Sequence, residues 1–270
     1  MLVFTVNEAF AGETTQRMIY DVYAGGFRVV QAKLVIDYSK KDRYDLSLDA
    51  GTYGFLGKLA PWHGTYTTTG WVMDDKRQPE KHQSVASWRD EVETHTYNYA
   101  KDGNFKTYVI QEEGKPKEIQ EPDLELTNNT LDLLSSTLLI MENVASGGLC
   151  EGTSEIFDGK RRFQKVFRDQ GETLLNASRY NIYGGPAREC TVEVIPVAGK
   201  WRDKPRGWMS IQEQGRERGM MPTLWMASIS DGVPAVPVKI RVKTAYGTMF
   251  MHLAEYQYGD KFLIAEKRKD

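Results

Sequence analysis

Apolar residues at every second position are the dominant pattern of this chain. Tyr44, Leu46, Leu48 and Ala50 alternate with polar residues, and the same period occurs in 30–38 and 236–242. Strands of antiparallel sheets that bury one face and expose the other show this alternation. Turn dipeptides such as Asp102-Gly103, Asp158-Gly159, Gly184-Gly185 and Asp231-Gly232 separate the segments. The pattern predicts further strands near 18–24, 65–73, 81–89, 91–100, 104–111, 161–168, 172–183, 189–195, 206–213, 223–230 and 246–258.

One segment breaks this period. Asn129-Thr130 can cap a helix, apolar residues follow from Leu131 to about Ala145, and Gly147-Gly148 ends the run. The apolar residues cover most of the helix circumference, which is typical of a helix buried on several sides. A second, short helix is predicted at 54–59. The sequence therefore predicts a mainly β fold: a strongly curved antiparallel sheet, or incomplete β-barrel, wrapped around one buried α-helix at about 129–145.

Composition narrows the class of protein. The 270 residues are 40% apolar and 27% charged, which excludes a disordered chain. A net charge of −2 argues against nucleic acid as a partner, because such proteins usually carry a basic excess. No stretch reaches the roughly 18 apolar residues that a membrane-spanning helix needs. The chain is therefore predicted not to span a membrane.

The N-terminus resembles the end of a secretory signal. Ala9-Phe10-Ala11 has the small-x-small form of a cleavage site, with Ala9 and Ala11 as the small residues, and Leu2–Val6 is apolar. No Lys or Arg precedes Arg17, so the charged part of a signal is missing, as it would be if the true start lay further upstream. A plain tail or an edge strand is the alternative. We interpret 1–11 as a possible signal-peptide remnant and 12–270 as a single β-rich domain.

Two cysteines and four histidines give few candidates for chemistry. Cys150 and Cys190 lie far apart without a CxxC motif, which argues against a metal site. In an exported protein such an even pair predicts one disulfide, whereas two buried thiols are the alternative in a reducing compartment. Nucleophile-elbow, phosphate-loop and dinucleotide-binding motifs are absent from the sequence, as is a zinc-protease motif. We therefore predict no catalytic residue, no metal and no cofactor.

A cluster of large apolar residues suggests a groove. Glycines bend the backbone around this cluster, and its members could line the space between the sheet and the long helix, although ordinary core packing is the alternative. Half-barrels of sheet and helix can hold apolar ligands in such a space. The candidate groove residues are Phe55, Leu56, Leu59, Trp62 and Trp71, with Leu134, Leu138 and Met141 on the helix.

Six short motifs, in order, resemble one protein family. They are YDVYAGGF at 20–27, LDLLS at 131–135, FDGKRR at 157–162, YGGPAREC at 183–190, PVKI at 237–240 and TAYG at 244–247. Over roughly 18–258 the chain looks like the proteobacterial domain-of-unknown-function family 3108 (DUF3108). The resemblance implies export to the periplasm and a disulfide between Cys150 and Cys190. It also implies an architecture similar to that of periplasmic lipoprotein carriers of the LolA and LolB type.

These observations favour a non-enzymatic periplasmic protein of the cell envelope. It would bind an apolar ligand, either a lipid or the acyl chain of a lipoprotein, or act in envelope integrity. A periplasmic protein partner is a further possibility, since sheet edges can accept another strand and make the protein a scaffold module. An enzyme of unrecognised type is the remaining alternative.

Overall fold

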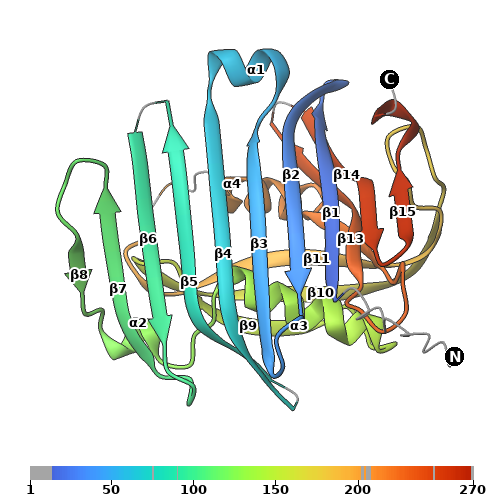
Figure 1. Ribbon diagram of the computed structural model, residues 1–270. Helices are drawn as coiled ribbons and strands as arrows, with labels where there is room; N and C mark the ends of the chain where they lie inside the picture. The colour runs from blue at the N-terminus through green and yellow to red at the C-terminus, as the bar shows by residue number, and fades with distance from the viewer. Residues whose placement is uncertain are drawn as a thin grey trace, which may run out of the picture.

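The alternating segments form the strands of one antiparallel sheet (Figure 1). A computed structural model describes residues 14–268 apart from 75, 90, 202–203, 205–207 and 246. Within these residues the sheet has fifteen strands. They are β1 (Thr15–Ala24), β2 (Phe27–Asp37), β3 (Arg43–Thr52), β4 (Trp62–Met73), β5 (Lys76–Trp88), β6 (Glu91–Tyr99), β7 (Phe105–Glu112), β8 (Glu118–Gln120), β9 (Gly152–Phe157), β10 (Arg161–Leu175), β11 (Gly185–Gly199), β12 (Thr223–Ala227), β13 (Val236–Thr244), β14 (Gly247–Tyr258) and β15 (Lys261–Ile264).

The predicted helices are present. The short helix is α1 (Gly54–Leu59), and the long one is α3 (Leu133–Ala145). The start predicted for α3 at Asn129-Thr130 is wrong, because Asn129 has a left-handed φ of 55° and Asp132 supplies the cap. The structure adds α2 (Leu124–Thr127), α4 (Trp208–Glu217) and a 3-10 turn, η1 (Glu266–Arg268).

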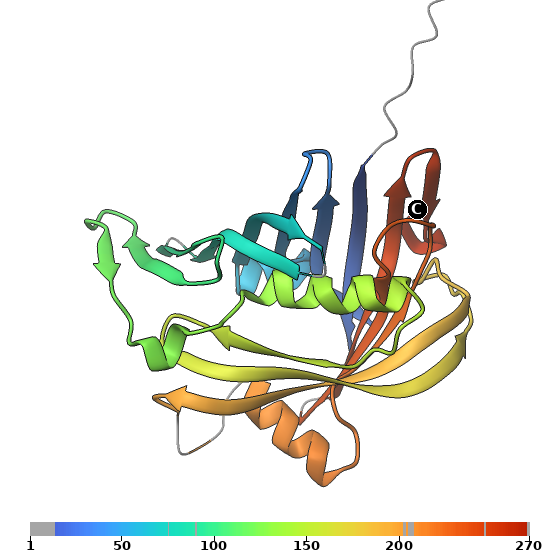
Figure 2. The same ribbon diagram turned by 90° about the horizontal axis from the view of Figure 1, so that it is seen from below.

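The sheet curls around α3 without closing. Its strand order is β8-β7-β6-β5-β4-β3-β2-β1-β14-β13-β12-β11-β10-β9, with β15 beside β14. Seen end-on, α3 lies between the wall of β1–β5 and the wall of β9–β11 (Figure 2). Side chains instead of backbone hydrogen bonds join the two ends, because Tyr97 and Tyr108 pack against Phe157. The predicted curved, incomplete barrel around one helix is therefore confirmed.

Both edges of the sheet are protected. The last strand at one end, β8, is only three residues long. At the other end, Leu131 bridges to Ile156 of β9, and its N–H donates to the carbonyl of Glu155. Short or covered edges of this kind disfavour the addition of a strand from another chain.

Two predicted strands need correction. The segment 206–213 is predicted as a strand, but its described part belongs to α4. Gln212 of α4 is fully buried and bonds both backbone groups of Val194 on β11 at 2.6 and 2.8 Å. The segment 172–183 continues β10 only as far as Leu175. A turn then follows, in which Asn181 donates to the carbonyl of Val238 at 3.0 Å.

Two predictions concern the membrane and export. In the described part of the chain, no helix combines the length and apolarity needed to cross a membrane. The candidate signal remnant at 1–11, with Ala9 and Ala11, lies outside the described residues.

Candidate ligand-binding site

The N-terminal end of α3 is anchored by a buried carboxylate. Asp132 Oδ1 accepts from the backbone N–H groups of Leu134 and Ser135 at 2.9 and 3.0 Å, and Ser135 Oγ donates to the other oxygen. Thr68 of β4 donates to Asp132 at 2.8 Å. The side chain therefore caps the helix and ties it to the sheet, as short polar caps do.

A histidine completes this anchor. His82 Nδ1 of β5 lies 2.8 Å from Thr68 Oγ1 and 3.4 Å from Asp132. Burial lowers the pKa of His82 below its usual range, although Asp132 opposes the shift. Ser135 bonds to Asp132 and lies 2.6 Å from Tyr44 OH, so its hydroxyl is directed away from the imidazole. This set of Ser, His and Asp lacks the nucleophile–base contact that covalent catalysis needs.

A buried lysine lies on another flank of the same helix. Lys165 of β10 donates from Nζ to the carbonyl of Leu133 at 3.1 Å and to Thr137 Oγ1 at 2.7 Å. Burial lowers the pKa of Lys165 to about 7, and Asp132 partly opposes the shift. The lysine holds α3 against β10 in addition to the contacts at the cap.

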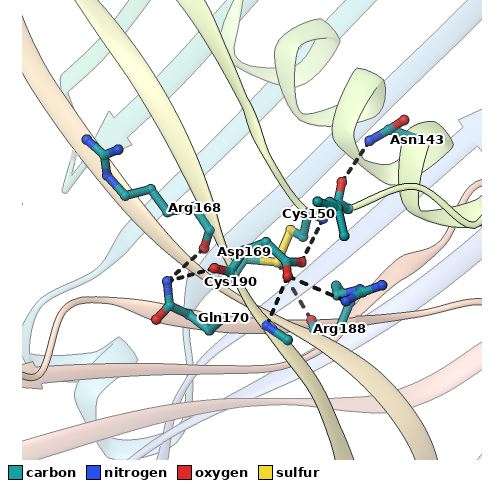
Figure 3. The surroundings of a disulfide bond; sticks show 9 residues. Asn143, Cys150, Arg168, Asp169, Gln170, Arg188 and Cys190 are labelled. Carbon is teal, nitrogen blue, oxygen red and sulfur yellow. Dashed lines mark hydrogen bonds and ion pairs between the residues drawn. A yellow bond between two sulfur atoms is a disulfide. The ribbon is translucent and has the colours of Figure 1, made fainter.

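The C-terminal end of α3 is fixed by the predicted disulfide (Figure 3). Cys150 follows the helix and is bonded to Cys190 of β11, with both cysteines fully buried. Asp169 accepts from the N–H of Cys150 at 3.0 Å, and Asn143 donates to the carbonyl of Leu149 at 2.7 Å. The pairing inferred from the sequence is confirmed.

Between these two fixed ends, a cavity lies beside α3. Its volume is about 270 Å³. This exceeds the roughly 150 Å³ of an engineered apolar cavity that binds benzene. Leu134, Thr137, Leu138 and Met141 of α3 form one wall. The sheet supplies the other lining residues, Tyr20, Ala32, Leu34, Ile36, Leu46, Leu48, Ala50, Pro237, Ile240 and Met251.

Two small residues create this space. Ala32 of β2 and Ala50 of β3 are direct partners in the register, and both line the cavity. Partners on neighbouring strands have their Cβ atoms only about 5 Å apart, so two methyl groups at this place leave the volume of two larger side chains unfilled.

The cavity is partly open to solvent. Leu34, Leu48, Ile240 and Met251 line it and are only half-buried. Two residues from Met251 on β14, Met249 lines a second hollow of about 410 Å³, together with Ile211 of α4 and Ala24 at the tip of β1. Residues two apart on a strand share a face, so Met249 and Met251 lie on the same face of β14, each beside one of the two spaces. Their flexible side chains suit ligands of variable shape.

The predicted groove residues separate into three sets. Leu134, Leu138 and Met141 line the cavity. Phe55 and Leu56 line a different hollow beside α1, and Leu59 is 61% exposed on the same helix.

The two tryptophans of the groove prediction lie on β4. Trp62 packs against the main core, whereas Trp71 lies on the other face of the strand, with the guanidinium of Arg43 5.2 Å from its ring. Trp71 follows Gly70, where a Cβ would meet Tyr44 in the core, so Trp71 points outward.

The sheet wall of the cavity is absent from the groove prediction. Its signal was in the sequence, because Ala32, Leu34, Leu46, Leu48 and Ala50 all belong to the buried faces that alternation identifies. Alternation shows only which residues are buried. The cavity also depends on the register that pairs Ala32 of β2 with Ala50 of β3.

The histidines do not converge on one site. Each lies on a different strand, and among the described residues no group of three His, Cys, Asp or Glu side chains is placed to hold a metal ion. His63 is 3.0 Å from Asp49, His82 belongs to the Asp132 cluster, His95 is 3.0 Å from Glu93, and His252 stacks on Phe250 and Tyr180.

Comparisons with known proteins agree with this fold. A crystal structure of a beta-barrel-like protein of the domain of unknown function DUF1849, from Brucella abortus, is similar with a TM-score of 0.51 at 10% identity. The match covers 92% of this chain and 98% of that one, and at this identity it shows the fold alone. Among proteins with curated descriptions, none matches the chain. The profile of the family described as "Protein of unknown function (DUF3108)" matches residues 19–254, and the chain therefore belongs to this family.

Proposed function

We propose that this protein binds an apolar ligand, the acyl chain of a lipid or lipoprotein, in the cavity beside α3. The observation that carries the proposal is the lining, in which Thr137 and the hydroxyl of Tyr20 are the only polar side-chain groups among the lining residues the structure describes. Apolar ligands are stabilised by roughly 25 cal/mol for each Å² of apolar surface they bury. Because the cavity is partly open, a chain can enter it without unfolding of the sheet.

One buried hydroxyl supports a ligand with an acyl carbonyl. Tyr20 lines the cavity, and its OH is buried without a hydrogen-bond partner among the described residues. An unpaired buried hydroxyl costs about 1–3 kcal/mol. A carbonyl or carboxyl oxygen of the ligand would accept from this hydroxyl and remove that cost.

The proposal places the protein in the bacterial cell envelope and gives it no catalytic step. The disulfide supports an oxidising compartment such as the periplasm, where such bonds persist. The missing contact between Ser135 and His82 and the scattered histidines support binding over catalysis. The sequence resemblance to the DUF3108 family, which implies an architecture similar to that of lipoprotein carriers, adds to this proposal.

Extraction of the purified protein tests the proposal. Organic extraction followed by mass spectrometry is expected to find an acyl lipid at close to one molecule per chain. The matched comparison is Ala32→Phe, which fills the cavity, against Lys33→Phe, which puts the same ring on the outer face of β2. Lipid recovered equally from both variants, or from neither variant nor the wild type, would overturn the proposal.

A further inference from the structure

One rim of the sheet carries exposed apolar side chains. The β1–β2 turn and α1 lie at the same end of the strands (Figure 1), and α1 packs against β2 and β3. Phe27, the first residue of β2 after this turn, is 77% exposed, while Phe55 and Leu59 of α1 are 75% and 61% exposed. Large apolar side chains gathered on one surface mark an interaction site more often than single ones do.

Cations surround these side chains. The guanidinium of Arg28 lies 3.6 Å from the centre of the Tyr53 ring and 3.3 Å from the buried carboxylate of Asp21. Arg179 lies 5.0 Å from the centre of the Tyr180 ring. A hollow of about 800 Å³ lies between them, and no acidic side chain is among its described lining residues. We define the rim patch as Phe27, Tyr53, Phe55 and Leu59 with Arg28, Lys58, Arg179 and Lys267.

We propose that the rim patch docks on an anionic lipid bilayer. Protruding aromatic and aliphatic side chains enter the headgroup region, while cations around them attract anionic lipids, each contributing about fivefold to binding. The distribution of charge along this rim agrees with docking through the rim patch alone. Farther along the same rim, β6 and β7 present Glu91, Glu93, Glu112 and Glu113, which an anionic surface repels.

Docking at this rim brings the bilayer close to the hollow that contains Met249. Ala24, at the tip of β1, lines both the hollow of the rim patch and the hollow that contains Met249. The β1–β2 turn therefore lies between the membrane-facing surface and the hollow that contains Met249, which is on the same strand as Met251 of the inner cavity. The docking inference goes beyond the proposed function, since the patch can bind a membrane whether or not the cavity holds a ligand.

Flotation with vesicles tests the inference on the full chain. The probe is phosphatidylethanolamine vesicles with added phosphatidylglycerol, compared with neutral phosphatidylcholine vesicles. We expect wild type to float with the anionic vesicles only, and less at high salt, because salt screens exposed charges. The variant Phe27→Ser/Phe55→Ser is expected to bind about a hundredfold more weakly, from roughly tenfold for each phenylalanine. Lys58→Gln/Lys267→Gln is expected to lose about twentyfold or more.

Matched controls lie at the opposite end of the sheet. Ile119 and Leu124 are 69% and 79% exposed on β8 and α2, so Ile119→Ser/Leu124→Ser removes similar exposed surface. Lys101→Gln/Lys106→Gln removes two exposed lysines, one in the β6–β7 turn and one at the start of β7. Thermal unfolding is measured first, to show that every variant has the same melting temperature as wild type. The inference is overturned if wild type ignores anionic vesicles, if the controls weaken flotation as much as the rim variants, or if a soluble anionic oligosaccharide binds this rim and vesicles do not.

Discussion

Helix α3 meets the sheet in two different ways. At its ends, polar and covalent contacts fix its position: Asp132 accepts from two helix N–H groups and two hydroxyls, and Cys150 is bonded to β11. On one side of the helix, the face that carries Leu134, Leu138 and Met141 borders unfilled space. The ends therefore hold the helix at a fixed distance from the sheet, and the middle keeps a cavity that close packing would otherwise remove.

Removal of the disulfide is expected to have the largest effect on stability. In the variant Cys150→Ala/Cys190→Ala, a bridge across 40 residues of sequence is lost, which costs roughly 4 kcal/mol in the chain-entropy model. Urea denaturation measures this change in the free energy of unfolding. A reductant should destabilise wild type and leave the variant unaffected. Equal stability of the two proteins would show that α3 is held by its N-terminal end alone.

Removal of the helix cap should come next. Asp132→Ala leaves two backbone N–H groups and two buried hydroxyls without their acceptor, and we expect a loss of about 3 kcal/mol. Asp123→Ala is the matched control, because Asp123 stands at the cap of α2 without a side-chain cap bond. We expect less than about 0.5 kcal/mol there. Similar melting shifts for both variants would contradict the role of Asp132.

Enlarging an alanine should distinguish the cavity from the filled core. Ala187→Leu inserts three carbon atoms where Ala187 is 2% exposed in the main core, and should cost about 1–3 kcal/mol. Ala32→Leu extends into the cavity and should be neutral or stabilise by up to about 1 kcal/mol. Chemical denaturation of both variants makes the comparison. An equal loss at both positions would mean that the cavity is not available space.

The buried lysine predicts a dependence of stability on pH, which is small for a change of one pH unit. Folded Lys165 has a pKa of about 7, against 10.5 for the ordinary side chain. Between these values the unfolded chain binds the extra proton, so the free energy of unfolding should rise with pH across this window, by at most about 1.4 kcal/mol per pH unit. Lys165→Met should flatten this rise, while Lys101→Met, at an exposed lysine, should not. Parallel curves for wild type and Lys165→Met would contradict the assignment.

The sequence predicts the sheet and α3 well because their signals are local. Strands β2, β3 and β13 each have one buried and one solvent-exposed face, so apolar and polar residues alternate along them. A helix buried on several sides is apolar around most of its circumference. Helix α4 was not predicted, because its most buried side chain is the polar Gln212, whose amide bonds to the backbone of β11. The spacing of apolar residues gives no signal for a contact made by a polar side chain.

The candidate site was predictable only in part. Its helix wall follows from the apolar face of α3, but its sheet wall depends on which strands pair and in which register. Trp62 and Trp71 are nine positions apart on β4, and this odd spacing places them on opposite faces of the strand. Sequence periodicity identifies buried positions, and the space between them follows only from the three-dimensional register.

Titration with a fluorescent fatty acid, cis-parinaric acid, tests the central claim most directly. The account predicts saturable binding near one molecule per chain for wild type and for Lys33→Phe. It predicts at least about tenfold weaker binding for Ala32→Phe, whose ring occupies the ligand's space. Absence of binding to wild type, or equal affinity in Ala32→Phe, would show that the cavity beside α3 is not a site for acyl chains.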